Sequence, residues 1–167
     1  MPEVTQSPKQ QFLDAFTQEH ATTMKVLRAF PASKGDFRPH PVSNSARDLA
    51  WTFALEQGLV SAALTDTLKL DGAFPKAQGD YDSIVAKFDS DFQGLTELIK
   101  KTPDTKYNTG SVKFFVGPQT MGDIPLPAFC QMTLRDQIHH RGQLSVYVRM
   151  AGGKVPSIYG PSHDEHW

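Results

Sequence analysis

Residues 134–153, LRDQIHHRGQLSVYVRMAGG, decide the fold because they join an apolar helical stripe to a polar centre. Apolar side chains recur there at intervals of three or four residues, which is the period of a helix that buries one face. With the residues just before this segment, the stripe comprises Cys130, Leu134, Ile138, Leu144 and Val148. We therefore predict a long, core-packed helix that begins after Pro125 and Pro127 and ends at the glycine pair 152–153.

A second line along the same helix is polar, and Asp136 and His140 lie on it one turn apart. Side chains four residues apart on a helix converge on one point, as two ligands of one metal ion must. His139 points about 100° away from His140 around the helix, so we do not expect it to join the same ion. Gly142 is unfavourable in a helix interior and predicts the close approach of another backbone. We expect this helix to face a pocket as well as a core.

The rest of the chain predicts three more helices and one extended segment. Apolar residues keep the helical period over residues 9–30, 46–68 and 84–99. Asn44 or Ser45 is expected to cap the second helix, and Asp82 or Ser83 the third. The stretch SVKFFVG, residues 111–117, is rich in β-branched and aromatic residues between turn signals. The predicted fold class is therefore all-α, a four-helix bundle with a short extended segment or hairpin between helices 3 and 4.

Length and composition restrict the classes of function. A chain of 167 residues is expected to form a single domain, residues 1–167, and the balance of 17 basic and 18 acidic side chains argues against a nucleic-acid partner. Cys130 is the only cysteine, which excludes an intramolecular disulfide and fits a reducing compartment. The N-terminus has no apolar signal-peptide core, and no long uncharged apolar run suits a membrane. We predict a soluble, cytoplasmic protein with no membrane partner.

Three quoted segments carry a resemblance to a known family. They are DQIHHRGQLSVYVRMAGGKVPSIYGPS at residues 136–162, SNSARDLAWTFALEQ at residues 43–57 and VLRAFPASKGDFRP at residues 26–39. The chain resembles the DinB-like superfamily of bacterial four-helix bundles, with HHRGQ and PSIYG as the most specific motifs. The resemblance extends over nearly the whole chain. It implies a metal-dependent hydrolase or thiol S-transferase that acts with a low-molecular-weight thiol.

The resemblance also implies a ligand set, which this chain changes. Many members bind a divalent metal through one histidine on the second helix and two histidines, four residues apart, on the last helix. His140 matches the later residue of that pair, Asp136 stands at the earlier one, and Thr52 falls on the second-helix position. Threonine is a poor ligand for zinc or nickel. Glu56, one turn beyond Thr52, is therefore the candidate third ligand or general base.

The predicted metal site thus consists of Asp136, His140 and Glu56, with Glu56 also the candidate catalytic residue. Manganese, iron, nickel and zinc are the candidate ions, and an oxygen-rich set favours manganese, magnesium or iron. The alternative is a metal-free small-molecule-binding or stress-response module that has lost catalysis, in which Asp136 and His140 are only a hydrogen-bonded pair. We expect a small-molecule substrate in the first case. A homodimer is a further expectation, because bundles of this size often bury a helix face against a second copy.

Three expectations concern residues outside this set. Arg141 is predicted to pair with carboxylates or to lie over Tyr147. Cys130 is predicted to be a small core residue, because a reactive thiol needs a cationic, partly exposed setting. The tail, residues 154–167, contains two prolines and is expected to be irregular and to pack on the body of the protein or on a neighbouring chain.

Overall fold

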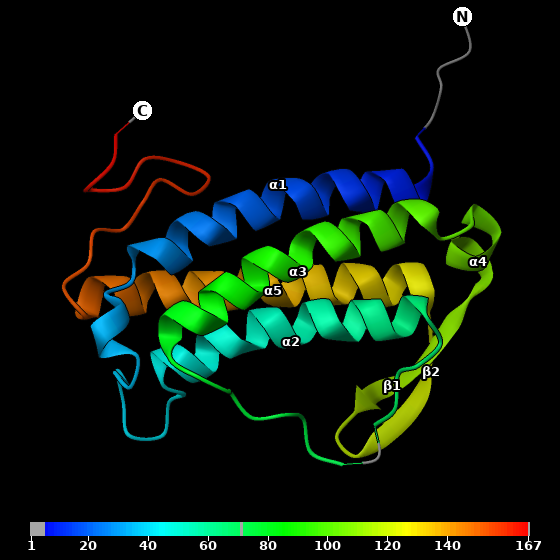
Figure 1. Ribbon diagram of the computed structural model, residues 1–167, viewed down its shortest axis with the longest axis horizontal. Helices are drawn as coiled ribbons and strands as arrows, with labels where there is room; N and C mark the ends of the chain where they lie inside the picture. The colour runs from blue at the N-terminus through cyan, green and yellow to red at the C-terminus, as the bar shows by residue number, and fades with distance from the viewer. Residues whose placement is uncertain (1–5, 71, 167) are drawn as a thin grey trace, which may run out of the picture.

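The computed structural model describes residues 6–70 and 72–166, within which the chain forms five α-helices and one two-stranded antiparallel sheet (Figure 1). The prediction that the N-terminus has no apolar signal-peptide core concerns in part residues 1–5, which lie outside the described residues. The elements are α1 (Pro8–Ala29), a 3-10 turn (Ala32–Lys34), α2 (Ala46–Leu64), α3 (Tyr81–Lys101), α4 (Asp104–Thr109), β1 (Ser111–Gly117), β2 (Thr120–Pro125) and α5 (Leu126–Met150). The long helices α1, α2, α3 and α5 lie alongside one another, and the hairpin crosses one end of the group (Figure 1).

The mainly helical fold with a short sheet agrees with the prediction, but the count of four helices is wrong. A fifth helix, α4, directly follows α3, so the hairpin lies between α4 and α5. A six-residue helix has less than two turns and leaves no amphipathic period to read from the sequence. The other differences lie at helix ends: α2 stops at Leu64, followed by Asp66 with a φ of 58°, and Asp80 rather than Asp82 or Ser83 caps α3.

Side-chain caps begin each of the first three long helices. The hydroxyl of Ser7 accepts the backbone N–H of Gln10, with Pro8 in the first turn of α1. The hydroxyl of Ser45 accepts from the backbone N–H of Asp48 at 3.1 Å and donates to the Asp48 carboxylate at 2.6 Å. Two hydrogen bonds therefore join the cap of α2 to its first turn. These bonds satisfy N–H groups that have no partner within a helix. They set where α2 begins and hence which residues face α5.

The core consists of two apolar clusters, one towards each end of the long helices. One cluster includes Leu27, Phe53, Phe88 and Val148, and the other includes Phe16, Val60, Leu95 and Phe129. Along α1, α2 and α5, several of the residues between the two clusters are polar and yet buried or half-buried. We call this set the central polar layer: His20, Thr23, Glu56, Gln57, Gln137, His140 and Arg141.

Arg141 is the most deeply buried charge of this layer, with 1% of its surface exposed. Its guanidinium donates to the Glu19 carboxylate of α1 at 2.6 Å and to the hydroxyl of Tyr159. The Tyr159 hydroxyl in turn donates to Glu19 at 2.7 Å. Of the two predicted contacts, Arg141 makes the carboxylate pair, and the ring it lies over is that of Tyr159, 4.9 Å from the centroid, rather than that of Tyr147. The C-terminal tail therefore packs on the body of the protein through Tyr159, which contacts the ion pair between Arg141 of α5 and Glu19 of α1.

Among the residues that the structure describes, none of the helices combines the length and the apolarity that crossing a bilayer requires.

We predict that Arg141→Ala lowers the free energy of unfolding by about 3–5 kcal/mol, because it leaves the carboxylate of Glu19 largely buried without its cation. Urea unfolding followed by circular dichroism measures this. Arg149→Ala is the matched control. Arg149 likewise forms a 2.6 Å ion pair, in its case with Asp164 of the tail, but its side chain is about half exposed. A surface pair contributes about 0–1 kcal/mol. Equal losses in the two variants would contradict the assignment.

Candidate metal centre

Three carboxylate and imidazole groups converge where α2 packs against α5. Glu56 comes from α2, while Asp136 and His140 come from successive turns of α5. One ligand atom of each residue lies within 4.8 Å of those of the other two. Within the described ranges, no other group of three or more acidic, histidine or cysteine side chains meets this condition. The structure thus brings together the three residues proposed from the sequence.

The contacts within the group are unequal. Nδ1 of His140 lies 3.1 Å from Oε1 of Glu56, a hydrogen-bond distance. Its other nitrogen, Nε2, lies 4.0 Å from Oδ1 of Asp136. The second carboxylate oxygen of Glu56, Oε2, is buried and has no hydrogen-bond partner in the described part of the chain. A buried carboxylate oxygen without a partner is costly, and a bound cation is one way to satisfy it.

Burial dominates the electrostatics of Glu56. Only 4% of its surface is exposed, and this burial raises its pKa to about 8, although the hydrogen bond to His140 opposes the shift. The pKa of His140 is also raised, mainly by that hydrogen bond, while its burial acts in the opposite direction. Both groups therefore hold protons more tightly than usual. A metal ion would have to displace these protons, so its binding would weaken as the pH falls.

Asp136 connects the group to a cavity of about 430 Å³. Its side chain is 55% exposed, in contrast to buried Glu56 and half-buried His140. The cavity lies between α2, β1 and α5 and is lined by Glu56, Leu59, Phe114, Met132, Thr133, Arg135, Asp136 and His139. A small molecule therefore has access to one side of the group while α2 closes the other.

The neighbouring candidates have other contacts. The hydroxyl of Thr52 donates to the carbonyl of Leu49 in its own helix. His139 lies 2.9 Å from the Gln143 amide and lines the same cavity as Asp136. The prediction for Gly142 is wrong, because a Cβ built there would meet nothing within 4 Å among residues 6–70 and 72–166, and no backbone in these ranges approaches it. Cys130 is fully buried, and burial raises its pKa to about 12, as expected for a core thiol.

Arg135 is the residue of this cavity that the sequence reading missed. It is exposed, precedes Asp136 directly, and forms no ion pair within the described residues. The sequence holds one signal for it, since Arg135 and His139 are four residues apart and must share a face of α5. The face they share is the one that borders the cavity.

A match to a known protein family extends over the whole sequence. The family model described as the DinB family matches residues 1–167. The chain belongs to the DinB family. Membership agrees with the resemblance carried by the closing helix and its tail.

One relative matches part of the sequence, and two solved structures share the fold. YrdA of Bacillus subtilis (strain 168), an uncharacterised protein, is 41% identical over 51 residues, which are 30% of this chain and 28% of YrdA. That match therefore spans less than a third of the relative. A DinB-like protein from Bacillus cereus ATCC 10987 has a TM-score of 0.70 at 22% identity, over 89% of this chain and 95% of that structure. The DinB-like protein YjoA of Bacillus subtilis has a TM-score of 0.66 at 14% identity, over 94% and 99%. At these identities the solved structures show a common fold only.

In the metal-free protein, the ionisation of Glu56 is expected to lower the free energy of unfolding as the pH rises. Its folded pKa of about 8 exceeds its ordinary value of 4.5, so the folded state holds the proton that the unfolded chain releases between these values. Its contribution is therefore fully present below pH 4.5 and is lost as the pH approaches about 8. We predict that Glu56→Gln removes this loss, so its melting temperature rises relative to wild type between pH 5 and pH 8 in chelator.

Differential scanning fluorimetry across this range, with Glu97→Gln as the control, measures the effect. Glu97 is a solvent-exposed carboxylate with a lowered pKa, mainly because Lys100 hydrogen-bonds to it. Its amide variant should follow wild type closely over the same range. Parallel curves for wild type and Glu56→Gln would show that Glu56 is not held protonated in the folded protein.

Proposed function

We propose that Glu56, Asp136 and His140 bind a divalent metal ion and that the protein is a metal-dependent enzyme of the hydrolase or thiol S-transferase type. The observation that supports this most directly is the unpartnered, buried Oε2 of Glu56 beside an imidazole and a second carboxylate. Two carboxylates and one imidazole favour manganese or iron, with nickel and zinc as further candidates. DinB family membership is consistent with such a role.

The carboxylate of Glu56 has two oxygens with separate tasks in this proposal. Oε1 accepts from Nδ1–H of His140, which fixes the ring and leaves Nε2 facing Asp136. Oε2 remains to coordinate the ion or to accept a proton as general base. A bound divalent ion would lower the pKa of a water or thiol, so that a nucleophile forms at neutral pH. Asp136, at the exposed side, completes the set from the cavity.

The substrate is proposed to be a small molecule that enters the 430 Å³ cavity. Leu59, Phe114 and Met132 supply apolar walls, which exclude water from a nucleophile. Arg135 and His139 stand at the same cavity and suit an anionic substituent. A low-molecular-weight thiol with a carboxylate fits this combination and the family resemblance.

The second candidate is a metal-free binding module. Thr52, which stands at the position of the family's second-helix histidine, uses its hydroxyl within its own helix. The Glu56–His140 hydrogen bond is also complete without an ion. In this alternative the cavity binds a small molecule but no chemistry follows.

Metal content separates the two candidates. Untagged protein, purified without chelator and incubated with manganese, iron, nickel or zinc, is expected to carry about one ion per chain by inductively coupled plasma mass spectrometry. His140→Ala should lose that ion, because it removes the only imidazole of the set and breaks the contact with Glu56. His139→Ala is the matched control, since it changes the adjacent histidine and should retain the ion.

Activity is the second part of this test. The loaded wild type is expected to hydrolyse p-nitrophenyl acetate or to conjugate glutathione with 1-chloro-2,4-dinitrobenzene, and His140→Ala should lose at least 100-fold of that rate. Absence of bound metal under all four loading conditions would contradict the proposal and leave the binding module as the better account. Equal metal content in His139→Ala and His140→Ala would exclude His140 as a ligand.

A further inference from the structure

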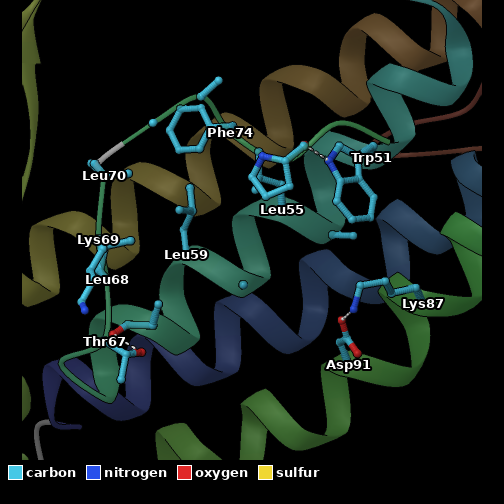
Figure 2. A pocket seen from close by; sticks show the side chains of 16 residues that line it. Trp51, Leu55, Leu59, Thr67, Leu68, Lys69, Leu70, Phe74, Lys87 and Asp91 are labelled. Carbon is cyan, nitrogen blue, oxygen red and sulfur yellow. Dashed lines mark hydrogen bonds and ion pairs between the residues drawn. The ribbon is translucent and has the colours of Figure 1, made fainter. Parts of the chain in front are cut away.

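A second cavity, of about 400 Å³, lies between α2, α3 and the segment that joins them (Figure 2). Figure 2 shows this segment passing above α2, with Leu70 and Phe74 over Leu55 and Leu59. The volume is within the usual range of small-molecule sites, about 300–1,000 Å³. Neither Asp136 nor His140 lines it.

The cavity exists because one face of α2 carries small residues. Ala54, Gly58 and Ala62 follow one another at intervals of four and so form one line on the helix. Leu55 and Leu59 stand beside that line. A Cβ at Gly58 would meet no described residue within 4 Å, so the space above this glycine is open within the part of the chain that the structure describes. No close backbone contact within the described residues requires a glycine at this position. Because glycine has no side chain, the cavity is deeper here.

Trp51 of α2 binds the segment between α2 and α3 where it passes over this cavity. Its indole Nε1 donates to the carbonyl of Pro75 at 2.6 Å, a contact drawn in Figure 2. The ring therefore serves as an end wall while its polar atom is occupied. Phe74, next to Pro75, is 41% exposed and stands at the opening, where an apolar guest would cover part of it.

Three of the four polar side chains that line the cavity have partners within the described residues, and the fourth, Lys69, is exposed. Lys87 and Asp91 of α3 pair with each other at 2.5 Å, and the Thr67 hydroxyl contacts that of Thr65 at 2.9 Å. Lys69, at the edge of the view in Figure 2, is an exposed residue. Among the described lining residues a charged ligand would find no buried counter-charge, and a buried unpaired charge is costly. The lining therefore matches a molecule without charge.

We propose that this cavity is a binding site for an uncharged, predominantly apolar small molecule. The site is separate from the metal centre and does not depend on it. The two cavities nevertheless share one wall, because Leu59 lines both. A guest in the apolar site therefore lies next to the cavity that Asp136 opens into.

The neutral fluorescent probe N-phenyl-1-naphthylamine tests the proposal on metal-free protein. The chain contains two tryptophans, Trp51 and Trp167, so a Trp167→Phe background leaves Trp51 as the sole donor of excitation energy. Titration is expected to give saturable probe emission on tryptophan excitation, with one probe per chain and matching quenching of Trp51. Emission that does not saturate, or that leaves Trp51 unquenched, would overturn the proposal.

A cavity-filling variant locates the bound probe. Gly58→Leu places a side chain in the open space, and leucine is also more favourable than glycine in a helix interior, so the variant should fold. Probe affinity is expected to fall at least tenfold. Gly94→Leu is the matched control: Gly94 lies in α3, has nothing within 4 Å of a Cβ, and does not line this cavity.

The proposal requires full probe affinity in Gly94→Leu and unchanged helical circular dichroism in both variants. Wild-type affinity in Gly58→Leu, or equal weakening in the two variants, would overturn it. Metal content is measured in parallel, and Gly58→Leu should bind metal as the wild type does. Failure of metal binding in the wild type would therefore count against the proposed enzyme function and leave the apolar site standing.

Discussion

The fold depends on a layer of buried polar side chains that crosses the bundle between two apolar clusters. Helices α1, α2 and α5 each interrupt their apolar stripe near the middle, at His20, Glu56 and Arg141. Burying such groups is unfavourable unless they are paired, so their partners restrict how the helices pack against one another. Arg141 aligns α5 with α1 and with the tail, and His140 aligns it with α2.

The same layer explains why the candidate metal site lies in the middle of a core helix. Arg141 reaches Glu19 and Tyr159, so this part of the layer is complete without a ligand. Glu56 is different, because one of its carboxylate oxygens has a partner and the other has none in the described chain. Neighbouring residues 140 and 141 of α5 thus have opposite consequences. Arg141 contributes to the stability of the fold. His140 lies beside Glu56, where a cation would give the second carboxylate oxygen a partner.

Much of this follows from the sequence, where the signal is local. Helical periodicity located the long helices, and Ser45 was one of two predicted caps. The one-turn spacing of Asp136 and His140 predicted that these two converge, whereas Glu56 was added through the family resemblance, and the structure brings the three together. Other features depend on the path of the chain. Glu19, the partner of Arg141, is 122 residues away in sequence, and the apolar cavity forms only where the α2–α3 segment passes over Gly58.

The side chains of Glu56, Asp136 and His140 are proposed to form one metal centre. The most direct measurement is an anomalous difference map from crystals grown with manganese and recorded at a wavelength where manganese scatters anomalously. We predict a single strong peak between α2 and α5, at about 2.0–2.3 Å from a carboxylate oxygen of Glu56 and from an imidazole nitrogen of His140. A map without a peak there, or with its peak at the tail histidines His163 and His166, would contradict the account.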